Sequence, residues 1–315
     1  MTVAKNRPAD WRRCRVDEFM GARSFSPNSQ KAYRRELNRF LNWTDKPLGS
    51  VNSRLIVKYK EHLIESLAPS SVNRALSAVS SFFDWLVLAY PSTLESNPVT
   101  PVSQLKLSSP PARDLNLNTV EALLKAVGSR PIVTRARDAA ILQVLLHGLR
   151  ASEVAALNLG DYDGVRLYIR QGKDDSSGTV PLNKAGRTAI NAYLQERRVA
   201  KERFSRLQPL FLSYNPIPNK PQRLGYQGIY YLIKDLESKT GLNEITPHRM
   251  RHTFATNLLL KGMDSLHART LTRHKSESSF KRYAKRALSA AAERAFYQAI
   301  GETSPDTLED VTDWS

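Results

Sequence analysis

The side chains best suited to chemistry in this chain gather between Thr246 and Arg286. Four of the six histidines lie there, with ten Lys or Arg residues against two acidic ones. Guanidinium groups bind phosphate oxygens in pairs and keep their charge at any working pH, and imidazole passes a proton near neutrality. Tyr283 follows Lys281 and Arg282, and neighbouring cations favour the nucleophilic phenolate form. The stretch therefore predicts chemistry on a phosphodiester without a metal ion.

The spacing of these residues is compatible with a single site on one helix. Thr246 and Pro247 are typical of a helix start, a hydroxyl cap followed by proline in the first turn. On that helix His248 and Arg251 are three residues apart and share a face, and His252 can reach the same face. His252 is explained equally well as a structural histidine, and an isolated HxxR spacing is usually a solvated helix face. The prediction therefore depends on other segments.

Three segments together resemble the tyrosine recombinase (phage integrase) family. Residues 247–256, PHRMRHTFAT, resemble the HxxRHTFAT box of the family, and residues 148–154, GLRASEV, resemble its GLRxSE box. His274, followed nine residues later by Tyr283, resembles the last histidine of the family and its nucleophile. The order of the boxes also suits the family. The simple, Xer-like integrase architecture fits the length of the chain best.

The resemblance implies that Tyr283 cuts one DNA strand, leaving a 3′-phosphotyrosyl bond and a free 5′-hydroxyl. Arg150 and Arg251 would hold the non-bridging phosphate oxygens. Because the covalent bond conserves the energy of the phosphodiester, neither ATP, a metal ion nor another cofactor is required. The implied catalytic residues are Arg150, Lys173, His248, Arg251, His274 and Tyr283, with Glu153 and His252 in supporting positions.

A hairpin is predicted between the strand patterns of residues 165–171 and 179–182. Lys173 lies in the loop between them and matches the hairpin lysine of the family, which would protonate the leaving 5′-oxygen. Lys184 is a rival for this role.

One position departs from the family pattern. The family commonly has Leu-Gly-His ahead of the nucleophile, whereas this chain has Thr272-Arg273-His274. Arg273 would replace a tightly packed residue and add a phosphate contact. The remaining tyrosines, among them Tyr226, Tyr230, Tyr231 and Tyr297, lack the histidine spacing and the cationic neighbours of Tyr283.

The charge balance favours a polyanionic partner. The chain has 47 Lys plus Arg against 30 Asp plus Glu, a net charge of +17 and a pI near 10.0, which favours nucleic acid over a membrane surface. The single cysteine, Cys14, excludes an internal disulfide and a cysteine-based zinc cluster. The sequence has neither an apolar run of membrane-spanning length nor a secretory signal. We therefore expect a cytoplasmic, nucleoid-associated protein without membrane contact.

Hydrophobic periodicity predicts a mainly α-helical chain with a small β-sheet. An all-helical N-terminal domain, with helices at about 27–43, 53–66 and from 69, resembles the SAM-like core-binding domain of the family. It would precede an α+β catalytic domain with helices at about 133–146, 185–206, 225–240 and 287–300. The charged side of residues 185–206, including Arg197, is expected to face solvent. The expected boundaries are a basic arm 1–15, a core-binding domain 16–96, a proline-rich linker 97–117, a catalytic domain 118–300 and an acidic tail 301–315.

Basic side chains on the N-terminal helices are candidates for DNA contact. The helix that begins near residue 69 also carries a small, polar side with Asn73, Ser77 and Ser80, which either lets a phosphate backbone approach or forms a plain solvent face. The DNA-binding candidates are Lys31, Arg34, Arg35, Arg74, Arg273 and Lys281.

Three functions are compatible with these features. A site-specific DNA recombinase is favoured over a type IB topoisomerase-like nicking-closing enzyme and over a non-catalytic DNA-binding regulator. The resemblance implies double-stranded recombination sites as partners, with a monomer in solution and a homotetramer on DNA. The helix at 287–300, anchored by Phe296, either passes into a neighbouring subunit or packs in its own. The target sequence and the biological outcome are not predicted.

Overall fold

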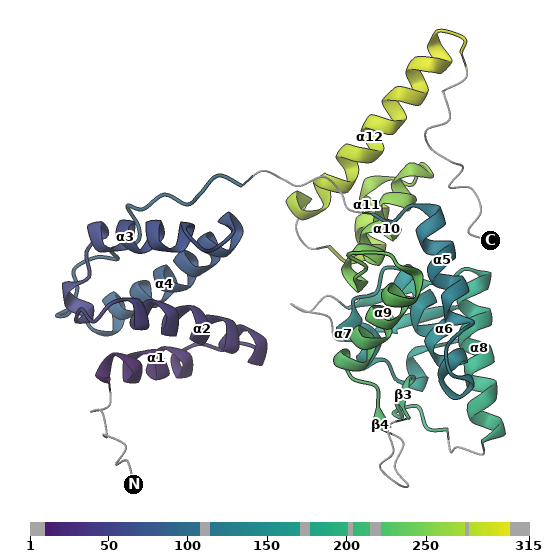
Figure 1. Ribbon diagram of the computed structural model, residues 1–315, viewed down its shortest axis with the longest axis horizontal. Coiled ribbons are helices and arrows are strands. Elements are labelled where there is room, and N and C mark those ends of the chain that lie inside the picture. Colours follow the sequence, from purple (N-terminus) through teal and green to yellow (C-terminus); the bar gives the residue numbers. More distant parts are fainter. Residues whose placement is uncertain are drawn as a thin grey trace. The chain divides into compact units, whose positions relative to one another are not determined.

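Helices account for most of the computed structural model, which describes residues 10–107, 114–170, 177–200, 204–214, 222–274 and 277–302. The chain divides into two units, Met1–Ser109 and Pro110–Ser315 (Figure 1), and each has a hydrophobic core of its own. The mainly helical fold with a small β-sheet is confirmed. Among the described residues, the helices are too short or too polar to cross a membrane.

The first unit is a bundle in which α2 packs along α1 and α4 (Figure 1). Ser26 begins α2 by accepting a hydrogen bond from the Ser29 N–H, and a hydroxyl at this position satisfies an amide that has no partner within the helix. The ring of Phe19 lies 5.6 Å from that of Phe82, inside the bundle. The described elements are α1 (Trp11–Ala22), α2 (Pro27–Trp43), a 3₁₀ turn (Leu48–Ser50), α3 (Ser53–Ile64) and α4 (Pro69–Ala89).

Residues 11–15 are helical and belong to α1, whereas the sequence predicted that residues 1–15 form a basic arm outside the helical domain. Asp10 caps α1 by accepting from the Arg12 N–H. The Arg12 guanidinium then donates to the carbonyl oxygens of Leu41 and Thr44 at the end of α2. The helix α1 is short and begins with arginines, so its hydrophobic periodicity is weak. The sequence therefore did not predict that Arg12 links α1 to the end of α2.

The segment that follows α4 packs onto the first unit, although a linker was expected there. The Asn73 side chain donates to the Leu105 carbonyl and accepts from the Leu105 N–H, both at 2.8 Å. Asn97 donates to Asp84 at 2.7 Å. The polar side of α4 therefore fixes the segment that ends at Leu105, because the Asn73 amide satisfies the backbone groups of that residue. Hydrophobic periodicity does not reveal such a contact.

The second unit surrounds α6, which packs against α8 and α10 (Figure 1). The β1–β2 hairpin is antiparallel, with Leu167 opposite Val180. Asn116 caps α5 by accepting a hydrogen bond from the Thr119 N–H, two residues before the expected boundary of the domain at 118. The described elements are α5 (Leu117–Val127), α6 (Ile132–Leu146), α7 (Ala151–Ala156), a 3₁₀ turn (Leu159–Asp161), β1 (Arg166–Ile169), β2 (Gly178–Pro181), α8 (Lys184–Val199), β3 (Leu212–Ser213), β4 (Gln222–Arg223), α9 (Tyr226–Thr240), α10 (Pro247–Leu260), α11 (Ser265–Thr272) and α12 (Glu277–Ala299).

Two features of the second unit differ from expectation. Arg197 on α8 is 2% exposed rather than solvated, and it donates to the carbonyl oxygens of Pro209 and Leu210, both at 2.9 Å. A buried guanidinium is stable there because its donors are satisfied by backbone carbonyl groups. In addition, α12 begins at Glu277 instead of residue 287, so Tyr283 lies within a helix.

Candidate active site

A tight turn between α6 and α7 places Arg150. Gly148 adopts φ +80°, and a Cβ at this position would lie 2.4 Å from Cδ1 of Phe254 on α10. Only glycine fits such a left-handed, crowded position without strain. Arg150 follows as the N-cap of α7, where its backbone N–H donates to Glu153 at 2.8 Å. The GLR sequence thus fixes the start of α7 against α10.

Glu153 is a buried carboxylate among three guanidiniums. Its Oε1 accepts from Arg150 at 2.6 Å, its Oε2 accepts from Arg273 at 2.6 Å, and Arg251 lies 3.9 Å from Oε2. The Arg150 side chain is 28% exposed, whereas the other two guanidiniums are almost fully buried. Three positive charges around one negative charge leave a net positive pocket, which suits a phosphate.

Arg251 is held on α10 by the backbone. It donates to the Gly148 carbonyl at 2.6 Å and to the Thr272 carbonyl, and its Nε lacks a hydrogen-bond partner among the described residues. Burial, followed by the nearby charge of Arg150, lowers the pKa of Arg251. A buried arginine with an unpaired N–H donor can bind an anion.

His274 is oriented by the end of α11. Its Nδ1 lies 2.8 Å from Oγ1 of Thr272, and that hydroxyl donates to the Ala268 carbonyl at 2.8 Å. Because the single hydroxyl proton points to Ala268, His274 carries its proton on Nδ1 and leaves Nε2 as an acceptor. Burial, and then the charges of Arg251 and Arg150, lower the pKa of His274 to about 3, so the ring is neutral.

The rings of three other candidates meet next to His274. His248 and His252 have centroids 4.4 Å apart, and the ring of Tyr283 lies 4.9 Å from His252 and 5.6 Å from His274. Tyr283 is 2% exposed, and Phe280 packs on it at 5.4 Å. The side chain of His248 is exposed. The tyrosine is therefore inside a small cluster between α10 and α12.

The described residues thus bring five of the six candidate catalytic side chains into one region. Lys173, the sixth, lies outside the described residues, as does the side chain of Lys281. Arg273, expected to contact phosphate, is buried and donates to Glu153 inside the site. Sequence reasoning did not single out Thr272, which binds both Arg251 and His274. No local pattern marks it, because its role depends on the turn that follows α11.

A second set of candidates surrounds Glu36 in the first unit. Glu36 is 1% exposed on its side chain and pairs with Arg35 at 2.7 Å, with Arg39 at 2.5 Å and with Arg74 at 3.4 Å. These arginines are 34–56% exposed, so their free edges reach solvent. We name Arg35, Arg39 and Arg74 the Glu36 cluster. Arg39 was not among the sequence candidates, although it lies one turn after Glu36.

The other basic candidates of α2 lie outside this cluster. Lys31 and Arg34 are exposed, and Arg34 pairs with Asp17 of α1. The exposed positive charge on α2 is therefore divided between a cluster held by a buried carboxylate and a pair at the surface.

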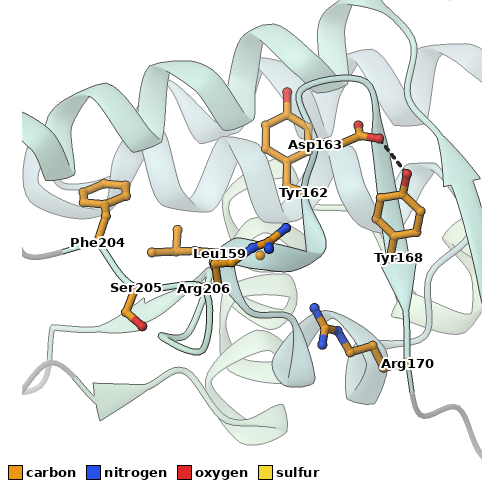
Figure 2. Close-up of a pocket in the computed structure, with 9 residues that line it drawn as sticks. Leu159, Tyr162, Asp163, Tyr168, Arg170, Phe204, Ser205 and Arg206 are labelled. Carbon is orange, nitrogen blue, oxygen red and sulfur yellow. Dashed lines mark hydrogen bonds between the residues drawn. The ribbon is translucent and has the colours of Figure 1, made fainter.

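Two hollows have Tyr168 and Arg170, at the end of β1, in their walls. An open one of about 780 Å³ is lined by residues that include Tyr168, Arg170 and Phe204, and Figure 2 shows Tyr168 hydrogen-bonded to Asp163 at its edge. A smaller one of about 270 Å³ shares Tyr168 and Arg170 and has Glu153 in its wall. Glu153 therefore contacts the arginines of the site and also forms part of the wall of the smaller hollow.

Comparisons with known proteins cover both units. Residues 113–289 match the model of the phage integrase family, and residues 13–89 match that of its N-terminal SAM-like domain. The chain is 30% identical to tyrosine recombinase XerC of Roseiflexus sp. (strain RS-1), covering 83% of this chain and 84% of the relative. It is 31% identical to tyrosine recombinase XerD of Listeria monocytogenes serovar 1/2a (strain ATCC BAA-679 / EGD-e), covering 83% and 89%.

Solved structures share the fold. A lambda integrase tetramer bound to a Holliday junction matches 90% of this chain and 82% of its own, with a TM-score of 0.67 at 16% identity. At this identity the match supports the arrangement of elements alone.

Proposed function

The chain belongs to the phage integrase family and is a tyrosine recombinase, and on that premise we propose that Tyr283 is the nucleophile that joins it to DNA. The observation that carries this assignment is the position of the Tyr283 ring between His252 and His274, next to the buried Arg251. A tyrosine in such a cluster has a neutral acceptor for its proton and positive charge for its phenolate.

The cleavage step follows from these groups. The Tyr283 oxygen attacks the phosphorus of the scissile phosphate, the bond from phosphorus to the 5′-oxygen breaks, and the phenol proton passes to Nε2 of His274. Burial and then the charges of Arg251 and Arg150 hold the pKa of His274 at about 3 before DNA binds, and the anionic phosphate offsets those charges and raises it. Arg150 and Arg251 stabilise the non-bridging oxygens, whose negative charge is largest in the transition state. We assign the proton taken up by the leaving 5′-oxygen to Lys173. Attack by another 5′-hydroxyl reverses these steps and joins a new strand.

The burial of Tyr283 adds a requirement to this mechanism. A side chain that is 2% exposed cannot reach a phosphate until the contacts between α10 and α12 rearrange. We therefore propose that binding of the DNA site shifts α12 and uncovers the tyrosine. The contacts that must loosen are those of Phe280 with Tyr283 and His274.

We propose double-stranded DNA as the partner of both units and a tetramer as the recombining species. The Glu36 cluster supplies phosphate contacts from the first unit, and the net positive pocket around Glu153 supplies them from the second. The argument for the tetramer is that Leu288 and Phe296 on α12, with Ile300 just after it, form an exposed apolar surface that a second subunit could cover. The lambda integrase that shares the fold is a tetramer on a Holliday junction. Its DNA substrate places the protein with the nucleoid.

A suicide substrate, nicked next to the cleavage position so that resealing fails, tests the nucleophile. DNA fragments from the source of the chain are incubated with wild type and with Tyr283→Phe in EDTA, and covalent complexes are separated on denaturing gels. We expect a protein-linked band from wild type and none from Tyr283→Phe. Tyr297→Phe, on the exposed half of α12, is the matched control and should retain the band. A band that persists with Tyr283→Phe refutes the assignment.

A further inference from the structure

Arg273 occupies a backbone conformation that disfavours its residue type. At the end of α11 the His274 N–H donates to the Arg269 carbonyl and the Arg273 N–H donates to the Thr270 carbonyl, which is the Schellman motif. Arg273 stands at the left-handed position of the motif, with φ 52° and ψ 44°. Glycine is usual there, because a Cβ crowds the neighbouring carbonyl oxygen. An arginine at this position therefore requires a compensating interaction.

The side chain of Arg273 supplies that interaction inside the site. It is 3% exposed, its Nη2 donates to Glu153 at 2.6 Å and its Nη1 donates to the Leu271 carbonyl at 2.9 Å. Cδ of Arg273 also packs closely on Gly178, since a Cβ added to Gly178 would lie 3.0 Å from it. Arg273 therefore connects α7, the end of α11 and the first residue of β2.

The contact with Glu153 decides how the carboxylate is shared. Oε2 accepts from Arg273 and from the Arg150 backbone N–H, while Arg251 remains 3.9 Å away. Without Arg273, Oε2 of Glu153 would keep, among the described residues, only the Arg150 N–H as a donor. Because a buried carboxylate that loses a charged partner is strongly destabilised, Oε2 would draw in the next guanidinium. That guanidinium is Arg251, which would leave its carbonyl partners.

We propose that Arg273 is a positioning residue for DNA cleavage, which holds Glu153 so that Arg150 and Arg251 keep the orientations in which they bind the scissile phosphate. This inference rests on the proposed function. It also replaces the expected phosphate contact of Arg273, because this buried guanidinium is paired directly with Glu153 at 2.6 Å. Arg251 instead donates to neutral carbonyl groups and lies 3.9 Å from that carboxylate, so its charge remains available to a phosphate. The residue acts on the reaction through its neighbours.

The first test separates catalysis from binding. Single-turnover cleavage of the suicide substrate is measured for wild type, Arg273→Gly and Arg273→Lys, and Kd for the intact site is measured with each change in a Tyr283→Phe background. Glycine suits the left-handed backbone, so the turn is retained. We expect Arg273→Gly to slow cleavage by about 10-fold or more, within the ~2- to ~150-fold typical of residues coupled in one network. Kd should change less than about threefold, and Arg273→Lys should restore part of the rate.

The second test uses the close approach at Gly178. In the wild-type background Gly178→Ala should displace the Arg273 side chain and slow cleavage, whereas in the Arg273→Gly background the same change should have little further effect. Glu153→Gln combined with Arg273→Gly should likewise cost less than the product of the two single effects.

The outcomes are distinct. A Kd that weakens as much as the rate would make Arg273 a DNA contact, and an unchanged rate would reduce it to a helix cap. Independent effects of Gly178→Ala and Arg273→Gly would also overturn the proposal. If wild type forms no covalent complex, the proposed function fails first, before the variants are compared.

Discussion

At the scale of single residues, the site depends on one buried carboxylate and on two backbone positions with positive φ. Glu153 gathers Arg150 and Arg273, Gly148 turns the chain into α7, and Arg273 turns it out of α11. Buried ion pairs contribute little net stability, because desolvation offsets their attraction. Their value here is that they fix guanidiniums in a water-poor site, where a charged ligand is bound strongly.

The turn at Gly148 gives a prediction on stability and activity together. In Gly148→Ala, the new Cβ would lie 2.4 Å from the Phe254 ring at a left-handed φ, so we expect the second unit to lose about 1–3 kcal/mol. Arg150 would shift with the turn. Thermal unfolding and single-turnover cleavage measure both effects. Gly164→Ala, at φ +96° with open space around it, is the control and should lose stability from backbone strain alone while retaining the cleavage rate.

His147 gives a prediction on pH. Its Nδ1 donates to the Gln143 carbonyl and its Nε2 accepts from the Asn183 N–H, and burial lowers its pKa. Because the unfolded state then binds more protons, the contribution of His147 is complete above the ordinary pKa of about 6.5 and is lost as the pH falls below it. Hydrogen exchange of α6 amides should accelerate relative to the intrinsic rate between pH 7 and pH 5.5. His147→Gln should exchange faster at pH 7 and show a flatter pH dependence, whereas an unchanged slope would exclude His147 as the cause.

At the scale of elements, α12 has two halves with different surroundings. Phe280, Tyr283 and Ala287 are buried, whereas Leu288 and Phe296 are 68% and 57% exposed. The buried half holds Tyr283, the proposed nucleophile, against α10, and the exposed half offers an apolar surface of the kind that marks interaction sites.

The two halves should respond differently to substitution. Phe296→Glu should leave the melting temperature within about 1 °C of wild type, since an exposed position adds little to stability, and should reduce the fraction of tetramer on DNA in analytical ultracentrifugation. Phe280→Ala should lower the melting temperature by several degrees, because large-to-small changes in a core cost about 3–5 kcal/mol. Full assembly by Phe296→Glu would show that the exposed half of α12 has no part in the tetramer.

The elements with strong periodicity were predicted closely, and those set by tertiary contacts were not. Helices at 27–43 and 226–240 follow from their apolar spacing and caps. The early start of α12 escaped prediction because the residues before 287 are basic and polar around a few buried side chains. Arg197 was expected in solvent, and its partners, the Pro209 and Leu210 carbonyls, are not recognisable from local sequence.

The candidate site was predictable in its residue types and not in its connections. The spacing of His248 and Arg251 on one helix follows from the 3.6-residue period. The link from Arg273 to Glu153 spans 120 positions and depends on a left-handed turn that an arginine rarely adopts. Sequence reasoning therefore selected the three cations that surround Glu153, and it gave Arg273 a phosphate contact instead of the contact with Glu153.

At the scale of the whole molecule, positive charge is presented by both units. The net charge of +17 predicts DNA affinity that falls steeply with salt, because each neutralised phosphate releases counterions. In the first unit the Glu36 cluster is distinguished from other basic side chains by the buried carboxylate that fixes it. Fixed guanidiniums lose less conformational freedom on binding than mobile ones do.

The Glu36 cluster therefore gives a prediction for the complete protein. Arg74→Gln should weaken DNA binding about uniformly across sequences and reduce the slope of log K against log salt by about 0.9, the value for one lost phosphate contact. Arg54→Gln on α3 removes the same charge from a position outside the cluster, and it should change the slope little. Fluorescence anisotropy at several salt concentrations measures both, in a Tyr283→Phe background to prevent cleavage. A contact made by a positioned guanidinium depends on where the charge lies. Equal slopes of log K against log salt for Arg74→Gln and Arg54→Gln would therefore mean that net charge alone governs binding.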